Sequence, residues 1–250
     1  MADIVFLTPD DPPEAFPDPA TAPAEFDGLL AVGGDLTPQR LLAAYRRGIF
    51  PWYEAGQPIL WWSPDPRAVL VPSRLHISRS LRRTLRSDRY RVSIDQAFAS
   101  VIDACADTRS TSGTWITPDM RAAYLHLHQL GHAHAVETWD GAELVGGLYG
   151  IAIGSVFFGE SMFSYASDAS KVALVKLVRV LESRGIELID CQVANSHLTS
   201  LGSELMPRND FVRKVENLTQ KAGQTDPWHA APEQTSRLVP APATPARLRD

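Results

Sequence analysis

The chain has 250 residues, 44% of them hydrophobic and 21% charged, a composition that is typical of a globular protein with one large domain or two small ones. Its net charge of −5 argues against nucleic-acid binding by the chain as a whole. No apolar run is long enough for a membrane span, and the N-terminus has no signal-peptide pattern, so we expect no membrane partner. The two cysteines, Cys105 and Cys191, cannot form a disulfide framework and favour the reduced cytoplasm.

The first half of the chain predicts mostly helices. Residues 1–27 are rich in proline and acids and predict an extended, mostly irregular arm. Thr37 as N-cap, Pro38 at the first helical position and Gly48 just past the end predict a short amphipathic helix before an aromatic loop. Two prolines interrupt the strand pattern ILWWSPDPRAVLVP. Further helices are predicted over residues 79–86, 95–107 and 118–130.

The second half changes to strands. HAVETWD predicts a strand, and AELVGGLYGIAIGSVFFGESMF predicts a hairpin or meander. A strong helix follows over residues 169–184, then a short buried strand in ELIDCQV and a short helix in NSHLTSLGS. This order predicts the α+β class. Residues 219–250 are of low complexity, and we expect them to be disordered.

A basic run stands out from the acidic average. Residues 67–91 carry eight arginines and one acid, Asp88, and such a cluster attracts phosphates because screening limits distant charges to roughly 8–10 Å. Aromatic side chains beside arginines also hold single-stranded nucleic-acid ends. The aromatic members are Tyr45, Trp52, Tyr53, Trp61, Trp62 and Trp115, and the basic ones are Arg46, Arg47, Arg67, Arg79, Arg82 and Arg83. The alternative, tryptophans in the core and arginines on a solvated helix face, is favoured by the residues alone.

Two acids and an amide form a second constellation. Glu160 lies at the end of a predicted strand. Asp190 and Gln192 are two residues apart in the strand LIDCQV, so the side chains of Asp190 and Gln192 should point to the same face of that strand. A carboxylate among apolar neighbours needs a partner or has a raised pKa. The three side chains either line a pocket for a cation or an amine, or serve as structural hydrogen-bonding groups at strand ends.

Other motifs predict little chemistry. His126, His128, His132 and His134 lack a ligand spacing, so we expect no metal. Ser161 is not in a nucleophile elbow. Cys191 should point away from Asp190 and Gln192, toward the core.

Many ordered segments carry a family resemblance. They are LLAVGGDLTPQRLLAAYRRGIFPWY, PILWWSPDPRAVL, LHISRSLRR, GTWIT, YLHLHQLGHAHAVE, LVGGLYG, FFGESMFS, ASKVALV and LIDCQVANSHLTSLG. From about Phe16 to about Leu218, the chain resembles the bacterial leucyl/phenylalanyl-tRNA–protein transferases.

The resemblance implies a fold and a reaction. The fold is a small N-terminal domain over residues 1–65 and a GCN5-related N-acetyltransferase-like domain over residues 66–218, an antiparallel sheet flanked by helices. The implied enzyme is a cytoplasmic, monomeric aminoacyltransferase. It moves leucine or phenylalanine, and less readily methionine, from aminoacyl-tRNA to a protein with N-terminal Arg or Lys, which marks that protein for degradation. No cofactor is implied.

The resemblance also implies roles for particular residues. Asp190, Gln192 and Glu160 fall on catalytic and acceptor positions, and Trp52, Trp115, Tyr45 and Asn195 on positions around the terminal adenosine. The donor side-chain pocket falls on Leu148, Phe157, Met162, Leu174, Leu177, Leu181 and Ile189. Some relatives have phenylalanine at the positions of Leu177 and Leu181, which bears on the preference between leucine and phenylalanine. The acceptor stem of the tRNA falls on Arg79, Arg82, Arg83 and Arg86.

The expected mechanism needs little beyond alignment, because an aminoacyl ester is already activated. Asp190 acts either as a general base or as an electrostatic partner of the amine, and Gln192 donates to the carbonyl oxygen. Glu160 and Asp190 together should make a negative pocket for the cationic acceptor. Two alternatives remain. An acyl-CoA-dependent N-acyltransferase would need a pyrophosphate-binding loop before residue 169, and the sequence has no such loop. A non-enzymatic RNA-binding module would leave Asp190 and Gln192 without a role.

Overall fold

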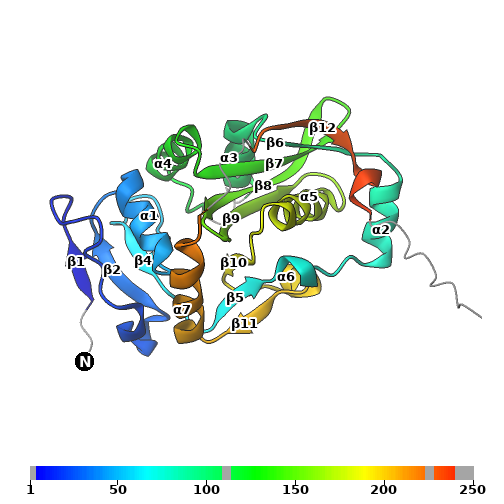
Figure 1. The fold of residues 1–250 in the computed structure, drawn as a ribbon. Coiled ribbons are helices and arrows are strands. Elements are labelled where there is room, and N and C mark those ends of the chain that lie inside the picture. The colour runs from blue at the N-terminus through cyan, green and yellow to red at the C-terminus, as the bar shows by residue number, and fades with distance from the viewer. Residues whose placement is uncertain (1–3, 109–113, 223–227, 240–250) are drawn as a thin grey trace, which may run out of the picture.

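Two β-sheets organise the molecule. A computed structural model describes residues 4–108, 114–222 and 228–239. The smaller sheet has the order β1-β2-β4-β3, and the larger has the order β11-β5-β10-β9-β8-β7-β6-β12. The division falls between Trp62 at the end of β4 and Arg67 at the start of β5 (Figure 1). The fold is therefore α+β.

The strands and helices have the following bounds. The strands are β1 (Val5–Leu7), β2 (Leu29–Gly33), β3 (Phe50–Pro51), β4 (Leu60–Trp62), β5 (Arg67–Leu70), β6 (Arg91–Ile94), β7 (Ala133–Asp140), β8 (Glu143–Ile153), β9 (Val156–Ser164), β10 (Leu188–Gln192), β11 (Glu204–Met206) and β12 (Ala230–Gln234). The α-helices are α1 (Pro38–Arg46), α2 (Arg79–Arg86), α3 (Phe98–Asp107), α4 (Pro118–Gln129), α5 (Ala169–Ser183), α6 (Ser196–Ser200) and α7 (Arg208–Thr219). The 3-10 turns are η1 (Pro19–Thr21), η2 (Ala24–Phe26), η3 (Pro72–Arg74) and η4 (Thr235–Leu238). None of the helices in these described ranges is both long and apolar enough to cross a bilayer.

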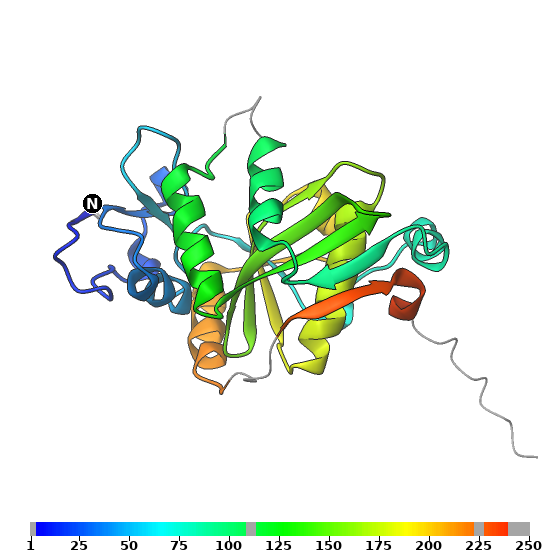
Figure 2. The same cartoon turned by 90° about the horizontal axis from the view of Figure 1, so that it is seen from above.

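Helices cover both faces of the larger sheet. Figures 1 and 2 show α3 and α4 on one face and α5 on the other. Two buried apolar clusters separate in the same way: one contains α3, α4 and the smaller sheet, and the other contains α5 and the buried side of α2. β7, β8 and β9 form an antiparallel meander, and β10 then returns parallel to β9 after α5. The parallel pair places the C-terminal end of β10 beside the middle of β9.

The helix signals in the sequence are confirmed where caps were predicted. The Thr37 side chain accepts a hydrogen bond from the Arg40 amide, and Pro38 occupies the first turn of α1. Gly48 follows the helix with φ of +70°, a left-handed conformation that glycine adopts without strain.

The N-terminal arm is more ordered than expected. β1 pairs parallel with β2, so the prediction of a mostly irregular arm is wrong for Val5–Leu7. The buried Arg40 donates to the carbonyl oxygens of Thr8, Pro12 and Asp11, at 2.8 Å for the last. A buried guanidinium that satisfies several carbonyls fixes an otherwise irregular segment.

The C-terminal segment corrects a second expectation. Disorder was predicted from residue 219 onward, but α7 ends at Thr219, β12 pairs antiparallel with β6, and η4 follows. The Thr235 hydroxyl donates to the Leu85 carbonyl at 2.9 Å. Without β12, β6 would be an unpaired sheet edge, and backbone pairing of that edge needs no apolar composition. Residues 223–227 and 240–250 lie outside the described residues.

Candidate active site

A cavity of about 480 Å³ opens between the two sheets. The smaller sheet contributes Phe50 and Pro51, and the larger sheet and its helices supply most of the remaining wall. The lining residues are Phe50, Pro51, Trp52, Trp115, Leu148, Tyr149, Phe157, Gly159, Glu160, Ser161, Met162, Leu174, Leu177, Ile189, Asp190, Cys191, Gln192, Val193, Asn195, Ser196, His197 and Leu198. The end of β10 and the middle of β9 therefore supply side chains to one space, and Glu160 lies in the middle of its strand and not at the predicted strand end.

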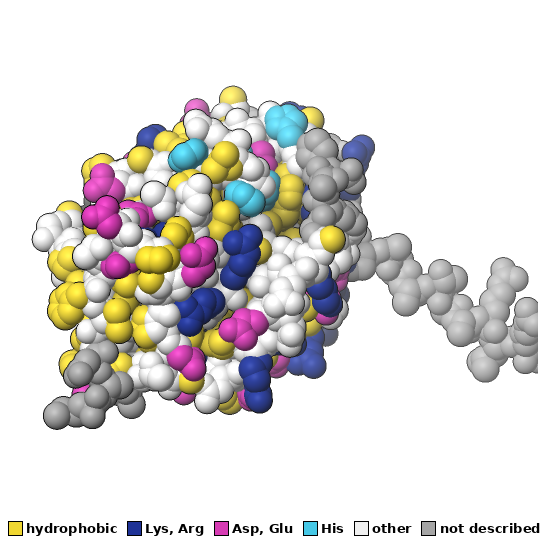
Figure 3. All heavy atoms as spheres, turned by 60° about the vertical axis from the view of Figure 1, so that its left-hand side comes forward, with side chains coloured by type: hydrophobic (Ala, Val, Ile, Leu, Met, Phe, Trp, Pro, Cys, Tyr) yellow, Lys and Arg dark blue, Asp and Glu magenta, His cyan; other side chains and the backbone are white. Residues whose placement is uncertain are grey.

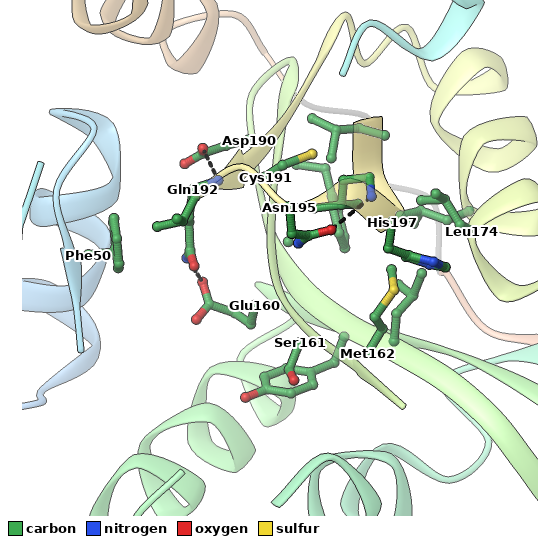
Figure 4. A pocket seen from close by; sticks show the side chains of 18 of the residues that line it. Phe50, Glu160, Ser161, Met162, Leu174, Asp190, Cys191, Gln192, Asn195 and His197 are labelled. Atoms are coloured by element: carbon green, nitrogen blue, oxygen red, sulfur yellow. Dashed lines mark hydrogen bonds between the residues drawn. The ribbon is translucent and has the colours of Figure 1, made fainter. Parts of the chain in front are cut away.

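The cavity has an apolar end and a polar end. Apolar side chains from β8, β9, α5 and β10 line one part: Leu148, Phe157, Met162, Leu174, Leu177 and Ile189. Figure 4 shows Met162 and Leu174 on one side of the cavity, while Glu160 and Gln192 meet on the side nearer Phe50. Six of the seven residues predicted for a donor side-chain pocket thus share a wall, with a carboxylate and an amide beside them.

Glu160 is the centre of a hydrogen-bond network. Its Oε1 accepts from the Tyr45 hydroxyl at 2.8 Å and from the side-chain amide nitrogen of Gln192 at 3.0 Å. Its Oε2 accepts from the Tyr124 hydroxyl at 2.7 Å. Burial raises the pKa of Glu160 to about 7, and the two tyrosine donors limit that rise. A carboxyl group with this pKa gains or loses its proton near neutral pH, and a nearby cation favours its ionised form.

Asp190 is held by a buried arginine. Its two carboxylate oxygens accept from Arg67 Nε at 2.8 Å and Nη2 at 2.7 Å, and both side chains are fully buried. The guanidinium carbon of Arg67 also lies 4.6 Å from the ring centroids of Phe50 and of Phe211. The prediction that Glu160 and Asp190 together form a negative pocket is therefore wrong for Asp190, because Arg67 neutralises the charge of that carboxylate.

The backbone turns sharply between Asp190 and Gln192. The register of β10 against β5 shifts between these residues, and Gln192 has φ of +60°. The backbone N–H of Gln192 donates to Asp190 Oδ1 at 2.9 Å, so the side chain of Asp190 stabilises the turn. Residues two apart in a regular strand point to the same face, but at this turn Asp190 meets Arg67 while the Gln192 side chain reaches Glu160. Cys191, expected to point toward the core, also lines the cavity.

Aromatic side chains lie at the mouth. Trp52 is 45% exposed, and its ring centroid lies 5.8 Å from that of Trp62, whose indole nitrogen donates to the Trp52 carbonyl. Trp115 lines the cavity from the segment before α4. Asn195 caps α6, where its side chain accepts from the Leu198 amide at 2.8 Å. The structure thus brings Trp52, Trp115 and Asn195 to the same cavity as Glu160.

Two predicted contact residues lie behind the wall instead. Tyr45 is fully buried, and its hydroxyl is bonded to Glu160 and Tyr124 behind the cavity wall, so its predicted place around an adenosine is wrong. Leu181 is buried in the cluster around α5 and is not among the lining residues. A helix turns by about 100° per residue, and Leu181 lies one turn beyond Leu177, where the cavity has ended.

The arginines divide into two kinds. Arg79, Arg82, Arg83 and Arg86 are exposed on α2 and form no ion pair with the residues that the structure describes. By contrast, Arg67 is buried on Asp190, and Arg47 donates to carbonyls of the N-terminal arm. The face in Figure 3 carries basic and acidic side chains interspersed among apolar ones, in keeping with the acidic average of the chain.

The roles of several residues at the site were not predicted from the sequence. Tyr124 and Arg67 hold the two carboxylates, and Ser161 and His197 line the cavity with a buried Oγ and Nε2 that have no hydrogen-bond partner within the described part of the chain. Burial lowers the pKa of His197, aided by Lys171. An arginine at the start of the apolar strand RAVL was the one available signal, since a charge in such a strand needs a buried partner.

The comparisons with known proteins point to one family over most of the chain. The model described as leucyl/phenylalanyl-tRNA protein transferase matches residues 69–216, and the model of the N-terminal domain of that family matches residues 34–65. The leucyl/phenylalanyl-tRNA–protein transferase of Aromatoleum aromaticum is 59% identical over 88% of this chain and 91% of its own length. That of Azotobacter vinelandii is 60% identical over 79% and 88%.

A solved structure is more distant. L-PGS from Bacillus licheniformis aligns over 81% of this chain and 64% of that one, with 10% identity and a TM-score of 0.39, too weak a likeness to bear on the site. The two sequence relatives and both family models are decisive: the chain belongs to the leucyl/phenylalanyl-tRNA–protein transferase family.

Proposed function

We propose that the chain transfers leucine or phenylalanine from aminoacyl-tRNA to the N-terminal amine of a protein, in the cavity between its two sheets. One observation carries the proposal: an apolar compartment lies directly beside Glu160 and Gln192. The donated side chain occupies the apolar end, which is lined by residues such as Leu174 and Met162. The ester carbonyl then lies at the polar end, where the acceptor amine arrives.

The apolar end accounts for a donor of intermediate size. A hydrophobic pocket discriminates by fit, and one methylene is worth only about 1–3 kcal/mol. Leucine, phenylalanine and methionine can all enter, whereas a charged side chain would lose its solvation without a partner. We place the terminal adenosine of the tRNA against the exposed indole of Trp52, with Trp115 lining the same cavity, because bases stack on aromatic rings. We place the acceptor stem against the exposed arginines of α2.

Glu160 recognises the acceptor in this proposal. The carboxylate faces the cavity, and a cationic N-terminal Arg or Lys residue favours its ionised form. When the acceptor binds Glu160, the Gln192 amide is released from its 3.0 Å bond and can donate to the developing charge on the carbonyl oxygen. Glu160 can also take up the proton that the attacking amine loses, because its pKa of about 7 is near that of a terminal amine.

Asp190 acts through its neighbours. Its oxygens are occupied by Arg67 and by the Gln192 backbone amide, so it is a positioning residue that fixes the turn carrying Gln192. No metal or covalent nucleophile is needed, because the ester is already activated and alignment can supply roughly 7–11 kcal/mol in favourable cases.

We further propose that the larger sheet is GCN5-related acetyltransferase-like and that the enzyme is a cytoplasmic monomer. An antiparallel sheet with helices on both faces supports the first statement. Two cysteines that form no disulfide and a tRNA substrate support the cytoplasmic location.

A transfer assay tests the proposal. Purified chain is given labelled leucyl-, phenylalanyl- or methionyl-tRNA and peptides that begin with Arg, Lys or Asp. We expect extension of the Arg and Lys peptides with leucine and phenylalanine, less with methionine, and none of the Asp peptide. Equal extension of the Asp peptide would contradict the role of Glu160, and failure to extend any peptide would contradict the reaction.

A further inference from the structure

The C-terminal segment, residues 228–239, begins with an indole that packs behind the candidate active site. Trp228 is partly buried against the apolar cluster around α5. It lines a second cavity, of about 320 Å³, which shares no lining residue with the active-site cavity. Trp228 also lies outside the residue ranges that the family models match. Neither the reaction of the family nor the active-site proposal gives this residue a role.

One aromatic pair lies between the two cavities. Phe157, on β9, is fully buried and lines the apolar end of the active-site cavity. Its ring centroid lies 6.1 Å from that of Trp228, with 31° between the ring planes, which is within the range of packed aromatic pairs. Phe157 is therefore part of the wall of the donor side-chain pocket, and Trp228 backs that wall.

Helix α5 shows at which end of the donor side-chain pocket this pair lies. Leu174 and Leu177 line the cavity, and Leu181 is buried one turn further on. Arg184, just past the end of the helix, lies over the Trp228 ring, 4.7 Å from its centroid. At about 1.5 Å per residue, the step from Leu177 to Arg184 is about 10 Å. Trp228 therefore lies beyond the closed end of the apolar compartment.

Trp228 is itself held in place. Its ring is stacked on that of the buried His134, with 4.0 Å between centroids and 8° between planes. His134 in turn is fixed by Asp95, which lies 2.8 Å from its Nδ1. The segment that follows Trp228 is anchored by the pairing of β12 with β6. An indole held by these contacts is a fixed backing for Phe157.

The Phe157 ring has a second rigid neighbour. A Cβ atom on Gly150, in the adjacent strand β8, would lie 2.6 Å from Cε1 and 2.7 Å from Cζ of Phe157. The ring therefore lies directly on the backbone of β8, a contact that needs glycine at this position. Since that backbone cannot give way, removal of the indole is the change that would free the ring to move away from the donor side-chain pocket.

We propose that Trp228 is a positioning residue that sets the depth of the donor side-chain pocket through Phe157. The inference rests on the proposed transfer reaction and gives the C-terminal segment a part in donor specificity. With Trp228 in place, the Phe157 ring closes the pocket at a fixed depth, and an apolar pocket discriminates by fit. Without the indole, the ring retreats into the vacated space, and the deeper pocket favours phenylalanine, the larger donor, over leucine.

The test compares donor preference in Trp228→Ala, Trp228→Phe and His229→Ala. The measured quantity is kcat/KM for phenylalanyl-tRNA divided by that for leucyl-tRNA, with an Arg-initiated peptide as acceptor. Trp228→Phe keeps a ring behind Phe157. His229→Ala is the control, because it changes the exposed next residue, whose side chain is bonded to Gln96. Thermal melting shows that each variant is folded, and a general loss of stability would lower both rate constants alike without moving their ratio.

We expect Trp228→Ala to raise the ratio roughly fivefold or more, Trp228→Phe to retain most of the parent value, and His229→Ala to leave it unchanged. In a Phe157→Leu background, Trp228→Ala should have no further effect, because the ring through which it acts is gone. If Trp228→Ala does not fold, Trp228→Leu, which also removes the indole, is used with the same expectation. An unchanged or lowered ratio in the folded variant, or an equal increase in the Phe157→Leu background, would overturn the proposal.

The parent protein separates this outcome from a failure of the proposed function. If the parent extends the peptide with leucine and phenylalanine while the Trp228 variants keep its ratio, only the role of Trp228 is contradicted. If the parent extends no peptide, the transfer reaction itself is contradicted, and the role of Trp228 is overturned with it.

Discussion

Glu160 should make the stability of the protein depend on pH in a direction opposite to that of most carboxylates. Its folded-state pKa of about 7 lies above the unfolded value of 4.5, so the folded protein binds this proton more tightly. The contribution is fully present below about pH 4.5 and is lost as the pH rises through about 7. At about 1.4 kcal/mol per pKa unit, the shift corresponds to roughly 3 kcal/mol.

Glu160→Gln removes this titration while retaining the shape of the side chain. Free energies of unfolding from urea denaturation, between about pH 5 and about pH 8.5, should fall more steeply for the parent than for the variant, by roughly 2–3 kcal/mol over the range. Glu143→Gln, which alters an exposed carboxylate of β8, is the control. Parallel curves for the parent and Glu160→Gln would refute the assignment of a proton to Glu160.

Other consequences can be measured separately. Arg67→Met leaves the buried carboxylate of Asp190 without a partner and should lower the free energy of unfolding in urea by about 3–5 kcal/mol; a loss below about 1 kcal/mol would show that the ion pair is dispensable. Trp52→Ala should leave the melting temperature nearly unchanged but raise KM for aminoacyl-tRNA, by the roughly 1–3 kcal/mol of one base stack, and an unchanged KM would remove Trp52 from the tRNA site. The double variant Arg82→Gln, Arg86→Gln should reduce the slope of log affinity for tRNA against log salt by about 0.7–0.9 for each phosphate that these two arginines neutralise, and an unaltered slope would move the acceptor stem elsewhere. Because burial raises the pKa of Cys191, a thiol reagent at about pH 8 should leave it unmodified in the native protein; rapid modification would contradict its placement.

Local signals in the sequence were sufficient for the elements that depend on local chemistry. Thr37 and Pro38 start α1 as predicted, because an N-cap acts on amides only a few residues away. The apolar pattern of α5 was equally readable, since its buried face packs on the sheet. The resemblance then brought most of the cavity residues together, which periodicity alone could not do.

The interaction partners of the charged residues could not be predicted from the sequence. Arg67 and Asp190 are 123 positions apart, and their bidentate pair depends on the antiparallel register of β5 against β10. The sequence placed Arg67 with the RNA-binding arginines, because a basic residue carries no mark of its burial. The same limitation applied to Tyr45: its helix was predicted, but the direction of its hydroxyl toward Glu160 depends on how α1 packs on β9.

Composition misled at the C-terminus. Few apolar residues and many prolines and alanines predicted disorder after Thr219, yet β12 lies along β6. Strand addition satisfies backbone groups of both partners and needs little side-chain burial. A few anchors, among them Trp228 against His134 and Leu238 in the core, then hold the segment in place.

The central claim is that the donated side chain occupies the apolar end of the cavity, and the donor preference of Leu174→Phe tests it most directly. The measurement is kcat/KM for phenylalanyl-tRNA divided by that for leucyl-tRNA, with an Arg-initiated peptide as acceptor. Leu205→Phe, on the exposed β11, is the matched control. The account predicts that Leu174→Phe lowers this ratio by roughly tenfold or more, because added bulk excludes the larger donor first, while the control leaves it unchanged. An unchanged ratio in a folded Leu174→Phe variant would place the donor residue elsewhere and contradict the account.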